Sequence, residues 1–282
     1  MSDKITVAIV YDFDGTLSPK NMQEYDFIPA VGRKTDEFWR DSTNIAEEQE
    51  GDIILGYMYY MLKEAKNRNI SLKRESFRDS GSKVELYQGV KEWFARVNAY
   101  GREHNVEIEH YINSSGLKEM IEGTSIASEF KKIYACSFFY DVDGVAFWPS
   151  VVVNYTTKTQ FLFKINKGIE SVADIKEVNQ YVPENKRRVP FKHMIYIGDG
   201  LTDIPCMKLT KMMGGHSIAV FNPENSNPEN INSLIKESRV DYVCEANYLP
   251  DSKLTQVVHK IIDKIELDDS LNGLREVLET GF

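Results

Sequence analysis

Paired acidic residues follow apolar runs at two widely separated places in the chain. Asp12 and Asp14 lie in the stretch IVYDFDGTL, and Asp199 and Asp203 lie in the stretch IYIGDGLTD. If folding brings these carboxylates together, they repel one another, and a hard divalent cation with oxygen ligands offsets that repulsion. Mg²⁺ suits such a site when a substrate phosphate completes it. The residue types therefore predict attack by an aspartate on a phosphoryl group, assisted by Mg²⁺.

Groups suited to hold a phosphate lie between the two acidic stretches. Ser114 and Ser115 end the apolar run HYINSSG at the expected start of a helix, where hydroxyls and free backbone N–H groups bind phosphate. Either serine can cap this helix, and Ser114 is favoured for the phosphate because it directly follows the run. A lysine must balance charge on the transferring group, and Lys158 is best placed, at an expected helix start. Lys164 and Lys167 on the same segment are the alternatives.

Apolar runs alternating with helical patterns predict the element order that would position these residues. The expected strands are short, rich in β-branched residues and buried on both faces, at residues 5–11, 106–112, 194–197 and 217–221. A helix is expected from Val90, with Gly101 as its cap, and another after Ser115. The pattern indicates a doubly wound α/β sheet, in which ligands bind beyond the carboxyl ends of the strands.

A helical insertion is expected after the first acidic stretch. Residues 21–86 contain no strand-like run, and their apolar residues trace one face of a long helix around Tyr57, with Ser71 as a cap for a second one. We therefore predict a core domain of residues 1–20 and 87–282 and a helical cap domain of residues 21–86. A helical pattern after Asp251 is expected to pack on the outside of the core.

Bulk composition excludes several functions. The chain has 282 residues and a formal net charge of −9, which disfavours a nucleic-acid partner. Its three cysteines form no CxxC pair, so reduced thiols in a cytoplasmic protein are expected. No apolar run approaches the roughly 20 residues that span a bilayer, so no membrane partner is expected.

Taken in order, DFDGTL, SSG, a lysine at a helix start and GDGLTD resemble the four motifs of haloacid dehalogenase-like phosphatases. The phosphoserine-phosphatase-like branch, with a helical cap after the first motif, is the most similar. The resemblance implies that Asp12 is the nucleophile and forms an aspartyl-phosphate. It implies that Asp14 is the general acid and then the base, which requires a raised pKa.

The remaining motif residues receive their roles from the same resemblance. It implies that Thr16 supports the first motif, that Ser114 contacts the phosphoryl oxygens, and that Lys158 pairs with Asp12 and the phosphate. It also implies that Asp199 holds Mg²⁺ together with the Asp12 carboxylate and the Asp14 backbone carbonyl, and that Asp203 supports the metal site.

Other conspicuous residues favour a structural interpretation. The stretch FFYDVDGVAF (138–147) repeats the DxDG pattern but lacks the following threonine, and a β-hairpin with a DG turn explains it better. The five histidines show no zinc-ligand spacing. Trp39 is expected to be a packing residue. The aromatic cluster from Tyr57 to Tyr60 could line a pocket of the cap, although helix packing is favoured for it.

These observations predict a Mg²⁺-dependent phosphatase of a small phosphorylated metabolite. The alternatives are a phosphotransferase or phosphomutase on the same scaffold and a non-catalytic binding protein that retains the fold. A dehalogenase is disfavoured because that branch does not need an aspartate two residues after the nucleophile. An ATP-driven pump is excluded, because the sequence contains no membrane-spanning run.

Overall fold

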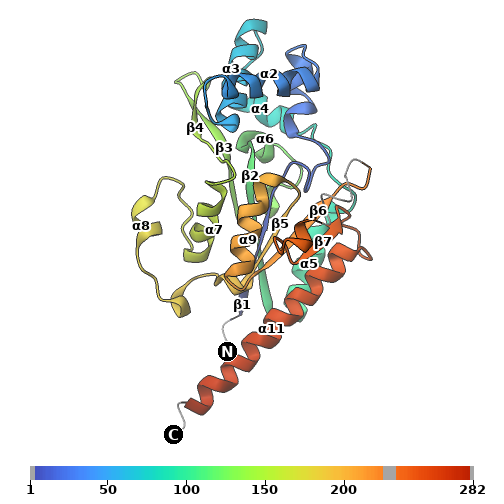
Figure 1. Cartoon of the computed structure of the whole chain (residues 1–282), viewed down its shortest axis with the longest axis vertical. Coiled ribbons are helices and arrows are strands. Elements are labelled where there is room, and N and C mark those ends of the chain that lie inside the picture. Colours follow the sequence, from blue (N-terminus) through green and yellow to red (C-terminus); the bar gives the residue numbers. More distant parts are fainter. Residues whose placement is uncertain (1–3, 225–232, 280–282) are drawn as a thin grey trace.

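The computed structural model describes residues 4–224 and 233–279. A seven-stranded sheet with the order β4-β3-β2-β1-β5-β6-β7 lies at its centre (Figure 1). Neighbouring strands are parallel, except for the antiparallel pair β3 and β4. The strands are β1 (Ile5–Tyr11), β2 (Val106–Leu117), β3 (Lys132–Tyr140), β4 (Ala146–Val151), β5 (Met194–Gly198), β6 (His216–Phe221) and β7 (Tyr242–Glu245). The predicted α/β fold with a parallel sheet is confirmed.

Helices cover both faces of this sheet, as a doubly wound fold requires. On one face α5 (Val90–Glu103) packs on β2 and on α11 (Lys253–Glu279), which also contacts β1 and β7. On the other face α7 (Lys158–Lys167) and α9 (Ile204–Met212) contact each other, and α9 packs on β5 and β6. Residues 7–11 of the central strand β1 are completely buried between the two layers. The C-terminal helix predicted on the outside of the core is confirmed as α11.

The remaining helices of the core are short. They are α6 (Lys118–Glu122), α8 (Ile175–Asn179), η2 (Ala127–Glu129), η3 (Glu184–Lys186), η4 (Phe191–His193) and η5 (Leu201–Asp203). Among the described residues, no helix combines the length and the apolar composition needed to span a bilayer.

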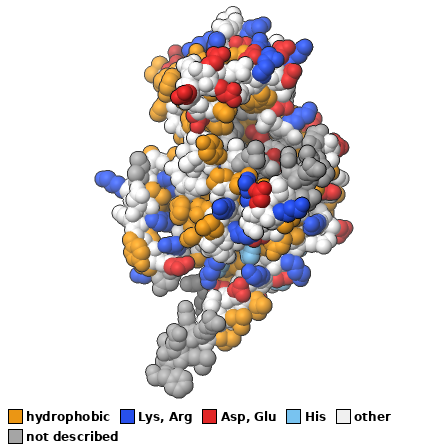
Figure 2. All heavy atoms as spheres, viewed as in Figure 1, with side chains coloured by type: hydrophobic (Ala, Val, Ile, Leu, Met, Phe, Trp, Pro, Cys, Tyr) orange, Lys and Arg blue, Asp and Glu red, His pale blue; other side chains and the backbone are white. Residues whose placement is uncertain are grey.

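Residues 21–86 are all described and form helices that gather over one end of the sheet (Figure 1). Figure 2 shows acidic and basic side chains intermixed on the outside of this helical group. The helices are η1 (Met22–Glu24), α1 (Phe27–Ala30), α2 (Thr35–Glu47), α3 (Ile53–Arg68) and α4 (Arg74–Gly81). The assignment of residues 21–86 as a separate cap domain stays a prediction.

The second DxDG stretch forms the turn of the β3–β4 hairpin, as the sequence predicts. Asp141 Oδ1 accepts hydrogen bonds from the backbone N–H groups of Asp143 and Val145, each at 2.9 Å. Gly144 has φ +74°, a left-handed conformation that favours glycine. The tip of this hairpin also contacts the helical group, because the N–H of Arg74 donates to the Gly144 carbonyl at 3.2 Å.

Two predicted helix caps are wrong. Helix α5 continues past Gly101 to Glu103, and Gly101 instead lets α5 approach β2, since a Cβ there would lie 2.7 Å from Ile108 Cγ1. Helix α4 begins at Arg74, so Ser71 does not cap it; the Ser71 hydroxyl accepts a hydrogen bond from the N–H of Lys73 instead. A tertiary contact with β2 therefore accounts for Gly101, whereas Ser71 makes a local hydrogen bond before the helix starts.

Candidate active site

The two acidic stretches lie side by side because β1 and β5 are neighbouring parallel strands. The N–H of Asp12 donates to the carbonyl of Ile197 at 2.9 Å, which places Asp12 where β5 ends. Gly15 turns the chain after Asp12 with φ +74°, and a Cβ on it would lie 2.0 Å from Asp199 Oδ2. Glycine is therefore required at position 15 both for its torsion angle and for the close approach of Asp199.

Three carboxylates converge at this edge of the sheet. One oxygen each of Asp12, Asp199 and Asp203 lies within 4.8 Å of the others. The Asp12 and Asp203 side chains are buried, whereas Asp199 is exposed to the adjoining cleft. Oxygens around one Mg²⁺ lie about 2.1 Å from the ion and therefore at most ~4.2 Å apart, so this spacing is close to that of a single-ion site.

Lys158 is the lysine that reaches these carboxylates. Its Nζ lies 3.2 Å from Asp12 Oδ1 and 2.7 Å from Asp203 Oδ1, and the side chain is completely buried. Burial lowers the pKa of Lys158, but the charges of Asp12 and Asp203 outweigh burial and raise it above its usual value. Lys164 and Lys167 donate to backbone carbonyls instead, within residues 171–180, so neither of these alternatives reaches the carboxylates.

Asp203 is held on several sides and in turn fixes Lys158. Its Oδ1 accepts hydrogen bonds from Lys158 Nζ and from the Tyr196 hydroxyl, both at 2.7 Å. Its Oδ2 accepts a hydrogen bond from the N–H of Gly200 at 3.3 Å. Since Asp203 is fully buried and engaged on both oxygens, its geometry suits a supporting position better than direct contact with a substrate.

Asp14 lies at the mouth of the same cleft. Its Oδ1 accepts a hydrogen bond from the N–H of Met22 at 2.8 Å, which ties the first turn of the helical group to the acidic stretch. Burial, followed by the charge of Asp12, raises the pKa of Asp14 well above its usual value. A carboxyl group that keeps its proton near neutral pH can act as a general acid.

Asp12 and Asp199, two of the three converging carboxylates, also have raised pKa values. Burial, together with the charge of Asp203, raises the pKa of Asp12 to about 6 even though Lys158 lowers it. Atoms packed around Asp199, together with the charge of Asp12, raise its pKa although the side chain faces the cleft. Burial is the larger cause of both pKa shifts, and the neighbouring carboxylates add negative charge that Lys158 only partly balances. The donor set of carboxylate oxygens therefore fits a hard divalent cation such as Mg²⁺.

The two serines lie in a strand and not at a helix start, so the expectation that one of them caps a helix is wrong. Strand β2 runs on to Leu117, which is the N-cap of α6, because the backbone stays extended past Ser114 and Ser115. Ser114 Oγ accepts a hydrogen bond from the N–H of Gly116 at 3.0 Å. Both serines nevertheless line the cleft. Thr16 lies beside it, with its hydroxyl 3.4 Å from Asp199 Oδ1.

These residues surround a cleft of about 260 Å³ between the sheet and the helical group. Two buried polar atoms of its lining residues have no hydrogen-bond partner, namely Gln23 Oε1 and Ser115 Oγ. A bound group could complete their hydrogen bonds.

The helical side of the cleft is formed by Trp39 and Tyr57 together with Asn21, Gln23 and Ile54. The expectation that Trp39 serves packing alone is therefore wrong, and Tyr57 agrees with the pocket alternative. The Tyr57 hydroxyl also donates to the carbonyl of Ser115 at 2.7 Å, which joins α3 to the serine stretch. No signal in the sequence pairs residues of the insertion with β2, because the contact joins positions 58 residues apart.

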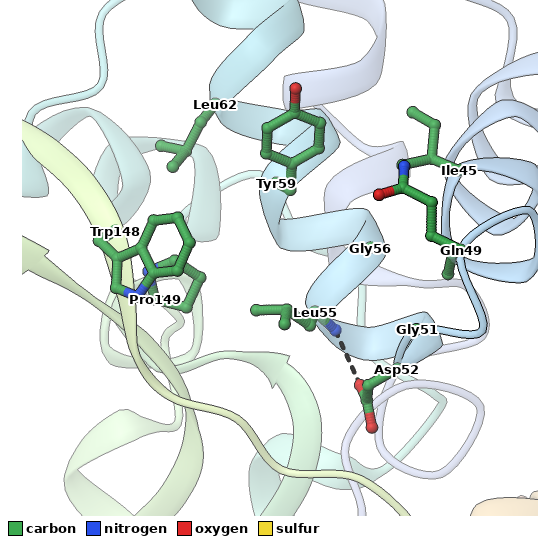
Figure 3. A pocket seen from close by; sticks show the side chains of 11 residues that line it. Ile45, Gln49, Gly51, Asp52, Leu55, Gly56, Tyr59, Leu62, Trp148 and Pro149 are labelled. Carbon is green, nitrogen blue, oxygen red and sulfur yellow. Dashed lines mark hydrogen bonds between the residues drawn. The ribbon is translucent and has the colours of Figure 1, made fainter.

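A second pocket, of about 370 Å³, is lined by residues of α2, α3 and β4 (Figure 3). Its walls are mostly apolar, with Leu55, Tyr59 and Leu62 on α3 facing Trp148 and Pro149 on β4. The acid at its rim, Asp52, is already engaged by the N–H of Leu55 and by the side-chain amide of Asn154. The groups able to do chemistry therefore line the smaller cleft.

Sequence comparison relates the chain to one protein family and to one individual protein. The family model for haloacid dehalogenase-like hydrolases matches residues 9–208, a span that contains both acidic stretches. A protein of Borreliella burgdorferi described as uncharacterized is 30% identical over 295 residues, which cover 92% of this chain and 96% of that protein.

Solved structures share the fold at low sequence identity. They include a hydrolase of the haloacid dehalogenase family from Salmonella enterica serovar Typhi (TM-score 0.58, 14% identity, covering 90% of this chain and 70% of that one). They also include a probable phosphoserine phosphatase from Vibrio cholerae (TM-score 0.57, 15% identity, covering 96% and 69%) and a substrate-bound phosphoserine phosphatase (TM-score 0.54, 16% identity, covering 85% and 93%). Because the family model spans more than half of the chain and its matched part carries both acidic stretches, the chain belongs to the haloacid dehalogenase-like hydrolases.

Proposed function

We propose that this protein is a Mg²⁺-dependent phosphatase that hydrolyses a small phosphorylated metabolite through an aspartyl-phosphate intermediate. The observation that best supports the proposal is the position of Asp12. Asp12 lines the cleft, and its Oδ1 is ion-paired with the buried Lys158 ammonium group at 3.2 Å. A carboxylate held in this way is suited to attack a phosphorus atom.

In the first step, a carboxylate oxygen of Asp12 bonds to phosphorus while the bond from phosphorus to the ester oxygen breaks. Asp14 donates its proton to that ester oxygen, so the leaving group departs as a neutral alcohol. In the second step, Asp14 takes a proton from water, the water oxygen bonds to phosphorus, and the bond between phosphorus and Asp12 breaks. Inorganic phosphate leaves, and both carboxyl groups return to their starting states.

Neighbouring residues hold the phosphoryl group during these steps. In this proposal the hydroxyls of Ser114 and Ser115, which line the cleft, and the Lys158 ammonium group beside Asp12 contact its oxygens, and Thr16 supports the first acidic stretch. When bound by Asp12, Asp199 and the Asp14 backbone carbonyl, Mg²⁺ supplies positive charge that screens the phosphoryl oxygens from the carboxylates.

Size and access favour a small substrate. The cleft of about 260 Å³ is covered by residues of η1, α2 and α3, and the hydrogen bond from Tyr57 to Ser115 holds α3 against the serine stretch. Such a cover excludes bulk water during attack on phosphorus and leaves little room for a phosphorylated protein.

The test is release of inorganic phosphate from a panel of phosphorylated metabolites, with and without Mg²⁺. We expect Asp12→Asn to lower kcat by about 10³-fold or more, because the nucleophile is lost. Asp143→Asn, in the exposed hairpin turn of the second DxDG stretch, serves as the matched control and should retain full activity. If Asp12→Asn releases phosphate as fast as the wild type, or if the phosphoryl group appears only on a second alcohol, hydrolysis by this mechanism is refuted.

A further inference from the structure

The part of the cleft that faces the leaving group carries no positive charge. Among the described residues that line the cleft, none is a lysine, arginine or histidine. Three basic residues of the helical group and its loops have acidic partners of their own: Arg33 with Asp41, Lys83 with Asp26, and Arg78 with Glu122. Lys158 is held by Asp12 and Asp203 beneath the phosphoryl position. A carboxylate or a second phosphate on the leaving group would therefore find no cationic partner.

Hydrogen-bond acceptors dominate the same wall. Gln23 is 1% exposed, lines the cleft, and has no partner for its Oε1. The side-chain amide of Asn21 donates to Glu24 Oε1 at 2.6 Å, and Trp39 Nε1 donates to the same oxygen at 2.9 Å. The N–H of Trp39 and one N–H of Asn21 are thus already used, and the Glu24 carboxylate accepts from both residues. A ligand group that donates would find an unpaired acceptor here in Gln23 Oε1.

Two aromatic rings, set nearly at right angles to each other, form the rest of this wall. The centroids of the Trp39 and Tyr57 rings are 5.8 Å apart, with 72° between the ring planes. Both rings are fixed, since Trp39 donates to Glu24 and Tyr57 donates to the Ser115 carbonyl. Aromatic faces carry negative electrostatic potential, and aromatic walls of this kind hold alkylammonium groups through cation–π attraction.

The net charge of the cleft also favours a ligand with an ammonium group. Asp12, Asp199, Asp203 and a substrate phosphate carry more negative charge than Lys158 and a divalent cation supply, and Glu24 adds to the excess. Each cleft residue contributes little alone, but together they make the field in the cleft negative.

We propose that the leaving alcohol of the substrate bears an ammonium group and no carboxylate, so that the substrate is the phosphate ester of a small amino alcohol. The ammonium group would occupy the corner between Trp39 and Tyr57 and donate to Gln23 Oε1, with Glu24 behind it. This inference rests on the proposed phosphatase activity and specifies its substrate class.

Four esters separate the two features of the leaving group. Phosphoethanolamine carries an ammonium group only, O-phosphoserine an ammonium group and a carboxylate, glycerol 1-phosphate neither, and 3-phosphoglycerate a carboxylate only. We expect kcat/KM with Mg²⁺ to be highest for phosphoethanolamine, about 10-fold above glycerol 1-phosphate, in keeping with a partly desolvated cation–π contact. We expect the carboxylate to lower kcat/KM by at least ~10-fold through like-charge repulsion. This factor should separate O-phosphoserine from phosphoethanolamine, and 3-phosphoglycerate from glycerol 1-phosphate.

A variant that removes the charge of Glu24 tests whether the ammonium group binds between Trp39 and Tyr57. Glu24→Gln retains an acceptor for Asn21 and Trp39 but removes the negative charge, so the ratio of kcat/KM for phosphoethanolamine to that for glycerol 1-phosphate should fall about 5-fold or more. Glu47→Gln, an exposed position on α2, is the matched control and should leave that ratio unchanged.

The outcomes separate this inference from the proposed function. Turnover of the esters with a preference for O-phosphoserine or 3-phosphoglycerate would overturn the inference and leave the phosphatase standing. Equal kcat/KM for phosphoethanolamine and glycerol 1-phosphate, or an unchanged ratio in Glu24→Gln, would also overturn it. Absence of Asp12-dependent turnover of all four esters and of p-nitrophenyl phosphate would refute the phosphatase and the inference together.

Discussion

At the scale of a single residue, Lys158 balances the negative charges of Asp12 and Asp203. Its ammonium group is completely buried and touches two carboxylates, so it belongs both to the stability of the fold and to the proposed chemistry. Lys164 is similarly buried but donates only to the carbonyls of Ser171 and Asp174. The two lysines therefore form a natural pair for separating structural from chemical roles.

We predict that Lys158→Met lowers kcat by about 10²- to 10³-fold, because the charge that stabilises the transferring phosphoryl group is lost. It should also lower the free energy of unfolding by about 3 kcal/mol, since Asp12 and Asp203 lose a buried partner. Lys164→Met should lose stability but keep its kcat. The measurements are phosphate release and urea unfolding, and equal loss of kcat in both variants would contradict the assignment.

Two glycines with the same backbone torsion offer a second comparison. Gly15 and Gly144 both have φ +74°, but only at Gly15 would a Cβ collide with a site residue, Asp199. Gly144→Ala should therefore cost about 1 kcal/mol of stability from left-handed strain and leave activity unchanged. Gly15→Ala should also displace Asp199 and weaken activation by Mg²⁺ about 10-fold or more, as for changes next to metal ligands. Mg²⁺ titration of activity and thermal unfolding distinguish the two; an unaltered Mg²⁺ response in Gly15→Ala would argue against a metal role for Asp199.

At the scale of elements, helix α3 connects the helical group to both phosphate-facing segments. Tyr57 bonds to the serine stretch of β2, and Asp52, at the N-cap of α3, accepts from the Asn154 amide at 2.6 Å. The carbonyl of Asn154 in turn accepts from the N–H of Lys158 at 2.9 Å, at the start of α7. The position of α3 is thus coupled to the loop that presents Lys158.

We predict that Asp52→Ala lowers stability by about 2 kcal/mol, about half from the lost cap and half from the lost bond to Asn154. It should also lower kcat about 10-fold, because the loop before Lys158 is less precisely held. Asp174→Ala removes the N-cap bond of α8, from the N–H of Glu177, away from the cleft. That control should lose about 1 kcal/mol and keep its kcat. A kcat unchanged in Asp52→Ala would show that α3 and the lysine loop are not coupled.

At the scale of the whole molecule, a buried polar network ties α5 to the centre of the sheet. Trp93 Nε1 donates to the Tyr11 hydroxyl at 2.8 Å, and that hydroxyl lies 3.0 Å from His110 Nδ1. His110 Nε2 lies 3.0 Å from Asn98 Oδ1, so a neutral imidazole satisfies both of its neighbours. Burial lowers the pKa of His110 to about 3.

This network predicts acid sensitivity of the fold. Between pH 6.5 and pH 3 the unfolded chain binds a proton at His110 and the folded chain does not, so the free energy of unfolding falls as the pH falls. From pH 7 to pH 5 His110 should account for a loss of about 2 kcal/mol. His193, His216 and His259 have pKa values lowered by burial and add to the same trend.

Urea unfolding at pH 7 and pH 5 tests the contribution of His110 to the pH dependence of stability. His110→Gln should show a smaller difference in the free energy of unfolding between the two pH values than the wild type does. Identical pH dependence in His110→Gln and the wild type would contradict a neutral buried imidazole.

Much of the fold and of the site can be predicted from the sequence alone, because both depend on local patterns. Continuous apolar runs followed by polar residues indicate buried parallel strands, and parallel strands present their carboxyl ends at one edge. Asp12 and Asp199 therefore meet across β1 and β5, and the second DxDG stretch, with its hairpin pattern, does not join them.

Only the tertiary structure decided which residues complete the site. It selected Lys158 over Lys164 and Lys167, extended β2 through the serines, and placed Gln23, Trp39 and Tyr57 in the wall of the cleft. The physical reason is that these assignments depend on packing between segments far apart in the chain. A side chain's own sequence neighbours set whether it is buried in a helix, but not which ligand-facing surface that helix covers.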